Sequence, residues 1–419
     1  MNNTNDARIL RELGREKFDI GNLAVQKRKS ELWRKLNRLE KTRPLVWINE
    51  IPWHEMESSP ELQLKCQDKF MCGVECGLRR ELYQWRHFPC DMVVEPVIYS
   101  EIVGGPVGSY ADYGIKEEHR EAPGGCDVGY IPVIHGLADA DKIRTPEVFF
   151  DKVATEKKFH RLSEIFNGMI PVKKRGIVHQ WHSPWDQIIH WYGIEQLYMD
   201  MYDRPELVHR ILKTFMRALN EVVDKQTELG MLDVGNGNWR VGSGGMGITD
   251  ELPSENKDGH TVTPREQWGC STSQIFSEVS PDMHEEFALQ YERTMMERYG
   301  LTYYGCCEPL HRKMDILKTV RNLRKISMSP WINMEEASEV LDKNYVFSFK
   351  PNPAHLATDD FNEELVKNYL RDFLAKTKKN RREIILKDVT TIRNDPSRLD
   401  RWAKMTMALA EDESICGNL

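Results

Sequence analysis

The sequence lacks an apolar run long enough to span a membrane, any excess of positive charge, and any Cys-x-x-Cys pair. A membrane-spanning helix needs about 20 apolar residues, and nucleic-acid-binding surfaces are usually basic, whereas this chain has a net charge of -7. Its nine cysteines are odd in number and unevenly spaced, and its first residues are polar rather than signal-like. We therefore expect a cytoplasmic protein with reduced thiols that binds neither nucleic acid nor membrane.

Eight short apolar runs, each followed by a helical pattern or a loop, organise most of the chain. They cover residues 44–51, 91–103, 176–182, 231–236, 301–304, 324–329, 345–350 and 383–388. Strands that alternate with helices indicate an α/β fold with parallel strands, and eight repeats predict a single (β/α)8 TIM barrel. Apolar positions at helical spacing within residues 1–42 predict an N-terminal helical extension before a barrel of residues 43–419.

Three long segments lie between these apolar runs. Residues 104–140 are rich in glycine and proline, and a loop of this length inside a compact fold is usually a lid or a binding loop. Residues 235–247 are rich in glycine but lack the spacing of a phosphate-binding loop, so we expect a flexible active-site loop. Residues 264–300 are expected to be helical.

The stretch from residue 303 to residue 311 is the expected centre of the chemistry. A buried apolar run ends at Gly305, and the next residues bring two thiols and a carboxylate, Cys306, Cys307 and Glu308. In barrels of this kind the carboxyl ends of the strands share one mouth, where chemistry collects. The alternative is a buried cysteine pair beside a glutamate that caps a helix, since free cysteine is often a small core residue.

The other predicted strand ends supply further polar side chains to the same mouth. They are Glu50 and His54, Glu101, His179, His182 and Asp186, Asn236 and Asn238, Ser329 and Trp331, Lys350 and Asn352, and Lys387 and Asp388; Trp185 belongs to a candidate aromatic pocket wall. His179 and His182 are three residues apart, so on a strand they face opposite sides and at most one faces the lumen. Lys387 and Asp388 could instead pair with each other. Such a mouth suits acid–base work or a divalent metal.

Several short motifs together resemble the uroporphyrinogen decarboxylase superfamily. They are Ser183-Pro184-Trp185, the Arg-Pro-Glu-Leu-Val of residues 204–208, residues 226–230, residues 97–102 and residues 346–353. Each is weak alone, but their order and spacing are fairly specific, and the likeness spans about residues 40 to 410. The resemblance implies a (β/α)8 barrel and one of two activities. One branch decarboxylates without a cofactor, and the other transfers methyl groups with zinc and a corrinoid protein.

The methyltransferase branch fits the residues better. The tip of the first strand has no arginine, which the decarboxylase uses to hold propionates. The methyltransferase zinc signature is His-x-Cys with a later Cys, and here Cys307 matches, whereas Gly305 and Asp388 stand at the other two positions. Against this signature the zinc site is altered or absent. Glu308 is an extra carboxylate with no counterpart in the signature, and it could hold zinc together with Cys307; the alternative to a metal is a general acid such as Glu101 or His190.

The resulting prediction is a methyltransferase that moves a methyl group from a small donor, such as a methoxylated aromatic or a methylamine, to a partner corrinoid protein. In this interpretation Glu101, His190 and Asp388 are catalytic. The substrate-binding residues are Glu50, His54, His179, His182, Trp185, Asn236, Asn238, Lys350 and Asn352. The alternatives are a cofactor-free decarboxylase acting on a smaller acid, with Glu101 or His190 as proton donor, and a binding protein that has lost its site. A homodimer is expected by analogy alone.

Overall fold

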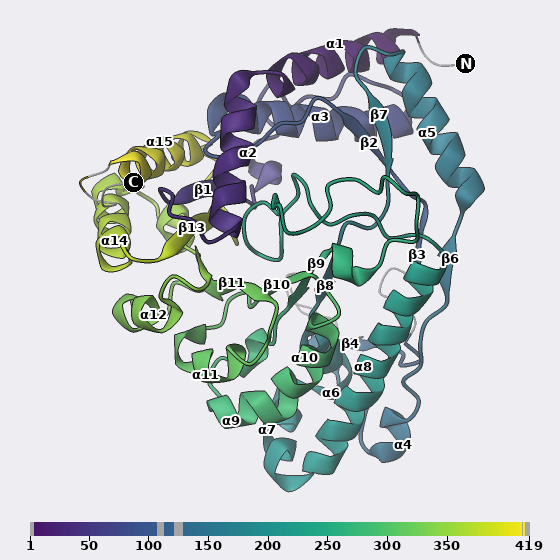
Figure 1. Ribbon diagram of the computed structural model, residues 1–419, viewed down its shortest axis with the longest axis vertical. Helices are drawn as coiled ribbons and strands as arrows, with labels where there is room; N and C mark the ends of the chain where they lie inside the picture. Colours follow the sequence, from purple (N-terminus) through teal and green to yellow (C-terminus); the bar gives the residue numbers. More distant parts are fainter. Residues whose placement is uncertain (1–3, 107–112, 121–128, 413, 415–419) are drawn as a thin grey trace.

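A curled sheet of seven parallel strands forms the centre of the molecule (Figure 1). The computed structural model describes residues 4–106, 113–120, 129–412 and 414. Along the sheet the order is β1-β13-β12-β11-β10-β9-β8. The strands are β1 (Leu45–Ile48), β8 (His179–His182), β9 (Trp268–Ser271), β10 (Leu301–Tyr304), β11 (Leu323–Met328), β12 (Val346–Phe349) and β13 (Arg381–Leu386). The predicted α/β class with parallel strands is therefore confirmed, in the form of a half-barrel.

Three two-stranded sheets lie beside the curled sheet. They pair β2 (Ile98–Glu101) with β7 (Val172–Arg175), β3 (Gly104–Pro106) with β6 (Val148–Phe150), and β4 (Glu118–Arg120) with β5 (Gly129–Ile131). The β2–β7 pair is parallel, and the other two are antiparallel. Only three residues separate β7 from β8, so the chain passes directly from this pair into the large sheet.

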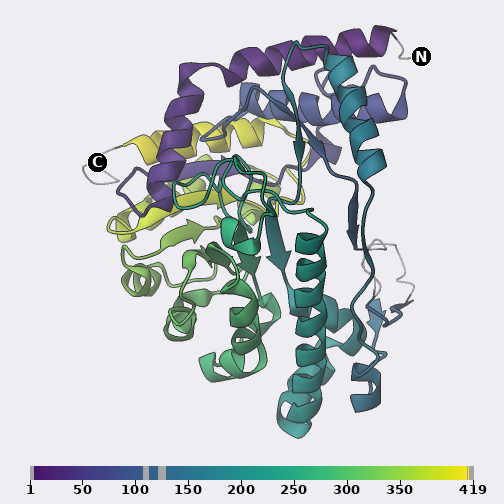
Figure 2. The same ribbon diagram turned by 45° about the vertical axis from the view of Figure 1, so that its right-hand side comes forward.

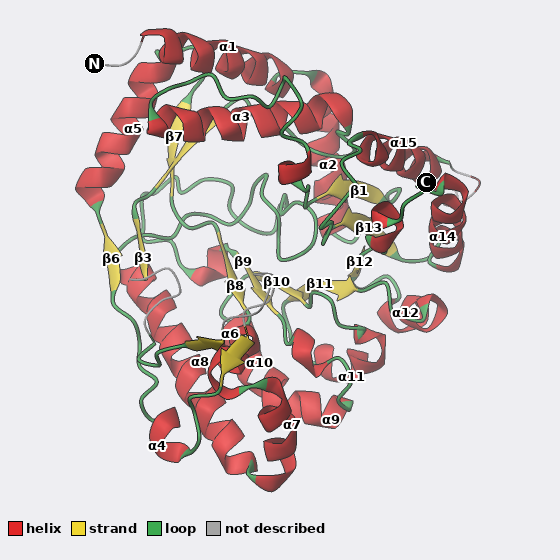
Figure 3. Cartoon of the chain, turned by 180° about the vertical axis from the view of Figure 1, so that it is seen from behind, coloured by secondary structure: helices red, strands yellow, loops and turns green. Residues whose placement is uncertain are grey.

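Helices cover the outer, convex side of the sheet (Figure 3). The α-helices are α1 (Thr4–Gly21), α2 (Ala24–Asn37), α3 (Lys69–His87), α4 (Leu137–Ala140), α5 (Lys152–Phe166), α6 (Pro184–Tyr192), α7 (Ile194–Asp203), α8 (Pro205–Glu228), α9 (Pro281–His284), α10 (Gln290–Met296), α11 (Met314–Leu317), α12 (Met334–Leu341), α13 (Ala354–Ala357), α14 (Glu363–Lys376) and α15 (Ser397–Glu411). Short helical turns are η1 (Trp53–Glu55), η2 (Pro264–Glu266), η3 (Gln274–Phe276), η4 (Glu285–Leu289) and η5 (Leu310–Lys313). Among the helices described, none is both long and apolar enough to cross a membrane.

The two faces of the sheet differ in chemistry because successive side chains of a strand point to opposite sides. On the outer face, Tyr304, Ile326 and Phe347 belong to the largest apolar cluster, which includes residues of α11, α12, α14 and α15. On the concave face, Lys325 forms a fully buried ion pair with Glu383, at 2.9 Å. The concave face is therefore partly polar.

The second half of the glycine-rich loop fills this concave face and is closely packed there, whereas an exposed position was expected for a flexible loop. Residues 241–249 are all buried. The amide of Gly245 donates to Glu383 (3.1 Å), and Met246 O accepts from Lys325 (3.3 Å). A Cβ on Gly242 would lie 2.5 Å from the Tyr303 ring, at a φ of +58° that disfavours other residues. The glycines therefore allow the loop to pass closely along the strands.

Two sequence predictions about strands are wrong. Residues 231–236 form no strand and contribute only an isolated bridge between Leu232 and Ile177. Conversely, β9 lies inside residues 264–300, which were expected to be helical, and it pairs with β8 and β10. β9 reads Trp-Gly-Cys-Ser, and its glycine, a residue depleted in strands, leaves no continuous apolar run that would mark it as a strand.

The expected helical extension is present as α1 and α2, which lie along one end of the molecule (Figure 2). α1 packs against α3 and α5. α2 packs against the glycine-rich loop: Trp33 is fully buried, and the Asn37 amide donates to Met246 O (2.9 Å) and Ile248 O (2.7 Å). The extension thus covers the end of the half-barrel opposite the carboxyl ends of the strands.

Candidate functional site

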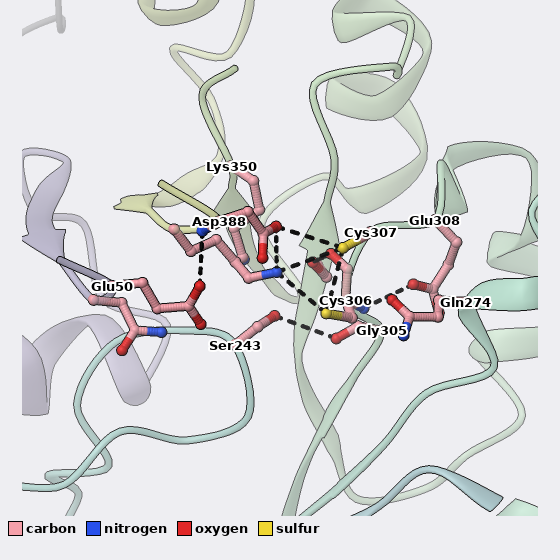
Figure 4. Close-up of polar contacts among 12 residues, drawn as sticks. Glu50, Ser243, Gln274, Gly305, Cys306, Cys307, Glu308, Lys350 and Asp388 are labelled. Atoms are coloured by element: carbon pink, nitrogen blue, oxygen red, sulfur yellow. Dashed lines mark hydrogen bonds and ion pairs between the residues drawn. The ribbon is translucent and has the colours of Figure 1, made fainter. Parts of the chain in front are cut away.

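The thiols of Cys306 and Cys307 and the carboxylate of Asp388 converge where β10 and β13 end (Figure 4). The two sulfur atoms lie 3.6 Å apart, and Cys307 Sγ lies 3.6 Å from Asp388 Oδ2. β11 and β12 separate β10 from β13 in the sheet. The two strand ends meet because the sheet curls, and the turns after both strands adopt positive φ at Gly305 (+96°) and Asp388 (+56°).

The ammonium of Lys387 lies among these three groups. Its Nζ is 3.3 Å from Cys306 Sγ, 3.5 Å from Cys307 Sγ and 2.6 Å from Asp388 Oδ2. The Lys387 side chain is only 4% exposed. Burial disfavours its charge, but the negative charges of Cys306, Asp388 and Cys307 outweigh burial and raise the pKa of Lys387. Lys387 and Asp388 do pair with each other, which was the alternative to a separate role for each, and the thiols join this pair.

The neighbouring thiols are made unequal by this environment. The hydrogen bond with Cys307 lowers the pKa of Cys306 to about 7, against the effect of burial and with the help of Lys387. The same hydrogen bond and burial raise the pKa of Cys307. The two thiols therefore titrate as a pair, in which the first proton leaves near pH 7 and Cys306 is favoured over Cys307 as the thiolate.

We expect iodoacetamide to alkylate Cys306 with a half-maximal rate near pH 7, below the value of about 8.5 for a free cysteine. The rate rises with pH because the thiolate is the nucleophile. Mass spectrometry of the peptide that contains both thiols would measure the profile, and Cys307→Ala, which removes the hydrogen bond that is the main cause of the shift, should move it upward. A wild-type profile centred above about pH 8.5, the value of a free cysteine, would contradict the assignment.

Glu308 follows the two cysteines in the chain and anchors the turn that carries them. Its Oε2 accepts the amide hydrogen of Cys306 (2.8 Å), and its Oε1 accepts the hydroxyl of Thr272 (2.9 Å), in a fully buried position. Because both carboxylate oxygens are hydrogen-bonded, Glu308 holds the backbone that presents the sulfur atoms.

Glu50 brings the end of β1 into the same site. Its Oε2 accepts the amide hydrogen of Asp388 (2.8 Å), and its carboxylate lies 3.5 Å from the guanidinium of Arg240. Arg240 also donates to Asn49 (3.0 Å). The structure therefore groups Glu50 with Cys307 and Asp388, as expected for shared strand ends.

Lys350 is buried on the concave face behind the thiols. Its Nζ donates to Tyr303 (2.8 Å), to the Ser348 hydroxyl (2.7 Å) and to the Ser348 carbonyl (2.9 Å). Burial lowers the pKa of Lys350 to about 7, and Glu383 opposes this shift. With three acceptors around it, Lys350 ties β12 to β10 rather than extending into the mouth.

Two of the expected catalytic groups have other partners. Glu101 forms an ion pair with Arg175 (2.5 Å) on the β2–β7 pair. His190 stacks on Tyr130 with ring centres 3.7 Å apart and lies 3.3 Å from Glu117. Neither of them shares a described hydrogen bond or ion pair with the thiol site.

The remaining predicted residues divide between the concave face and structural positions. His179 is half-buried, and burial lowers its pKa to about 4, with a further effect from Arg240. His182 lies on the opposite face, where it contacts Tyr299 (2.8 Å), so the prediction that at most one histidine faces the lumen agrees with this arrangement. His54 is exposed in η1. Four other side chains bond to the backbone. Three donate to carbonyl oxygens, Trp185 to Phe287, Asn236 to Leu252 and Asn238 to Val93, and Asn352 accepts from the Ala354 amide.

The thiol site does not fit the expected zinc ion. In the part of the chain that the structure describes, no three His, Cys, Asp or Glu side chains are grouped so that they could hold a metal ion. The two sulfur atoms and the Asp388 carboxylate surround the Lys387 ammonium instead. No known family model matches this chain. A comparison with curated proteins also found no match.

Proposed function

We propose that this chain is a methyltransferase that moves a methyl group from a small methylated donor to a partner corrinoid protein. The proposal combines the resemblance to the uroporphyrinogen decarboxylase superfamily with one observation, the buried ammonium of Lys387 between two thiols and a carboxylate at adjoining strand ends. It includes a complete (β/α)8 barrel, in which the β2–β7 pair would extend the curled sheet.

The ammonium of Lys387 is the group that would assist departure of the methyl donor's oxygen or nitrogen. Negative charge develops on that atom as its bond to the methyl carbon breaks, and a fixed cation in a water-poor site stabilises such charge strongly. Asp388, 2.6 Å away, orients the ammonium. The acceptor would be the reduced cobalt of a corrinoid that the partner protein carries.

The direct test is to mix the protein with a reduced corrinoid protein and candidate donors, and to follow the absorbance of methylcobalt. We expect a donor-dependent rise with at least one methoxylated aromatic, methylamine or methylthio compound. No spectral change with any of these donors would contradict the proposal. Cys76 is a half-buried thiol of α3, so the variant Cys76→Ser serves as a control, and it should leave the rise in methylcobalt absorbance unchanged.

A carboxy-lyase that acts on a small acid is the alternative. The same observation favours it, because the Lys387 ammonium could bind a substrate carboxylate. Carbon dioxide release from candidate acids, measured without any corrinoid protein, distinguishes the two reactions. Release at a substantial rate together with no methylcobalt would favour the lyase.

The proposal also places the protein in the cytoplasm, where thiols remain reduced. Seven cysteines of the described residues are free, including Cys306 and Cys307. The proposed chemistry requires these two thiols in the reduced form.

A further inference from the structure

We propose that the ammonium of Lys387 replaces a metal ion in this site, so that the thiols and Asp388 work with a built-in cation instead of zinc. The inference rests on the proposed function for its chemical meaning. Its geometry and its test do not depend on which methyl donor or acceptor is used.

The position of Lys387 Nζ supports the replacement of a metal ion by the ammonium. It lies within 3.5 Å of both sulfur atoms and 2.6 Å from Asp388 Oδ2, so all three candidate ligand atoms surround it. Zinc bonds are about 2.3 Å to sulfur and about 2.0–2.2 Å to oxygen. A zinc ion bound by these three atoms would therefore occupy the space that the ammonium fills.

The two thiols and Asp388 are at most three protein ligands, which excludes a four-ligand structural zinc site among the described residues and leaves the three-ligand catalytic kind, whose space the ammonium fills. Structural zinc sites use four protein ligands, and catalytic sites use three and a water. Glu308, the nearest further carboxylate in sequence, already accepts hydrogen bonds from Thr272 and the Cys306 amide with its two oxygens. Gly305, which opens the turn, carries no side chain at all.

The burial of the Lys387 side chain also opposes metal binding. This side chain is almost fully enclosed, and a buried charge is costly unless it is paired. Here the ammonium pairs with the Asp388 carboxylate and the shared negative charge of the thiols. Moving Lys387 aside to admit a metal would separate these charges, so the arrangement opposes metal binding.

Zinc content tests the inference. The protein is incubated with one equivalent of zinc under reducing conditions, desalted, and analysed by mass spectrometry for metal. We expect the wild type to retain far less than one zinc per chain. Lys387→Met removes the charge but keeps the length of the side chain, and it should retain clearly more zinc per chain than the wild type. Adding Cys306→Ser to this variant should remove the gained zinc.

Stoichiometric zinc in the wild type that is lost on Cys307→Ser would overturn the inference, and this result needs no Lys387 variant to fold. Lys387→Arg, which keeps a cation, should remain free of zinc, and zinc binding by this variant would also count against it. The proposed function and this inference are contradicted by different results. If no donor yields methylcobalt but only Lys387→Met gains zinc, the inference stands and the methyl transfer does not.

Discussion

Glu383→Gln is expected to lower the free energy of unfolding by about 3–5 kcal/mol, the usual cost of removing one partner from a buried ion pair. The carboxylate of Glu383 lies 2.9 Å from Lys325 Nζ, and both side chains are fully buried. It also accepts hydrogen bonds from Ser348 (2.6 Å) and from the Gly245 amide (3.1 Å). A neutral amide at this position would leave the Lys325 ammonium enclosed without its counter-charge. Urea denaturation followed by circular dichroism would measure the loss.

The double variant Lys325→Met/Glu383→Leu separates charge from packing. It removes both charges and keeps similar side-chain volumes, so it should be clearly more stable than Glu383→Gln. If Glu383→Gln unfolds at the same urea concentration as the wild type, the ion pair does not stabilise the packing of the glycine-rich loop against the sheet.

Lys387→Met is expected to slow methyl transfer by about 10²–10³-fold, as found when one donor to a developing anion is removed. The reason is that the ammonium is the only cation within hydrogen-bond distance of both thiols among the described contacts. The rate of methylcobalt formation at saturating donor would show the loss. Circular dichroism would check that the variant is folded, because Lys387 is buried and pairs with Asp388.

Lys404→Met is the matched control for this experiment. Lys404 is 75% exposed on α15 and pairs only with Asp400 among its described contacts, so its loss should leave the rate unchanged. Equal rates for the Lys387 variant and the wild type would show that the ammonium does not take part in the reaction.

The strand ends were predictable from sequence because apolar runs that stop at polar residues mark buried parallel strands. That pattern located the ends of β1, β10, β12 and β13, and with them Glu50, Cys307 and Asp388. It missed the roles of Cys306 and Lys387, because a sequence does not reveal which of two adjacent side chains faces a shared site. Here both sulfur atoms do.

The glycine-rich loop shows why the rest could not be predicted. Glycine clusters usually indicate freedom of the backbone. At Gly242 and Gly245, however, only the neighbouring residues explain why no side chain fits. The partners of those glycines, Trp33, Tyr303 and Glu383, are distant in sequence. Tertiary contact, not local preference, determined this segment and the short strand β9.

The packing of residues 241–249 against α2 fills the space behind the strands. These residues and Trp33 are buried together there. In the proposed reaction a small donor and a large acceptor protein would both approach the thiols at the carboxyl ends of the strands, and they would bind there in turn. Saturating concentrations of the acceptor should therefore delay entry of the donor, a pattern of inhibition that steady-state kinetics can detect.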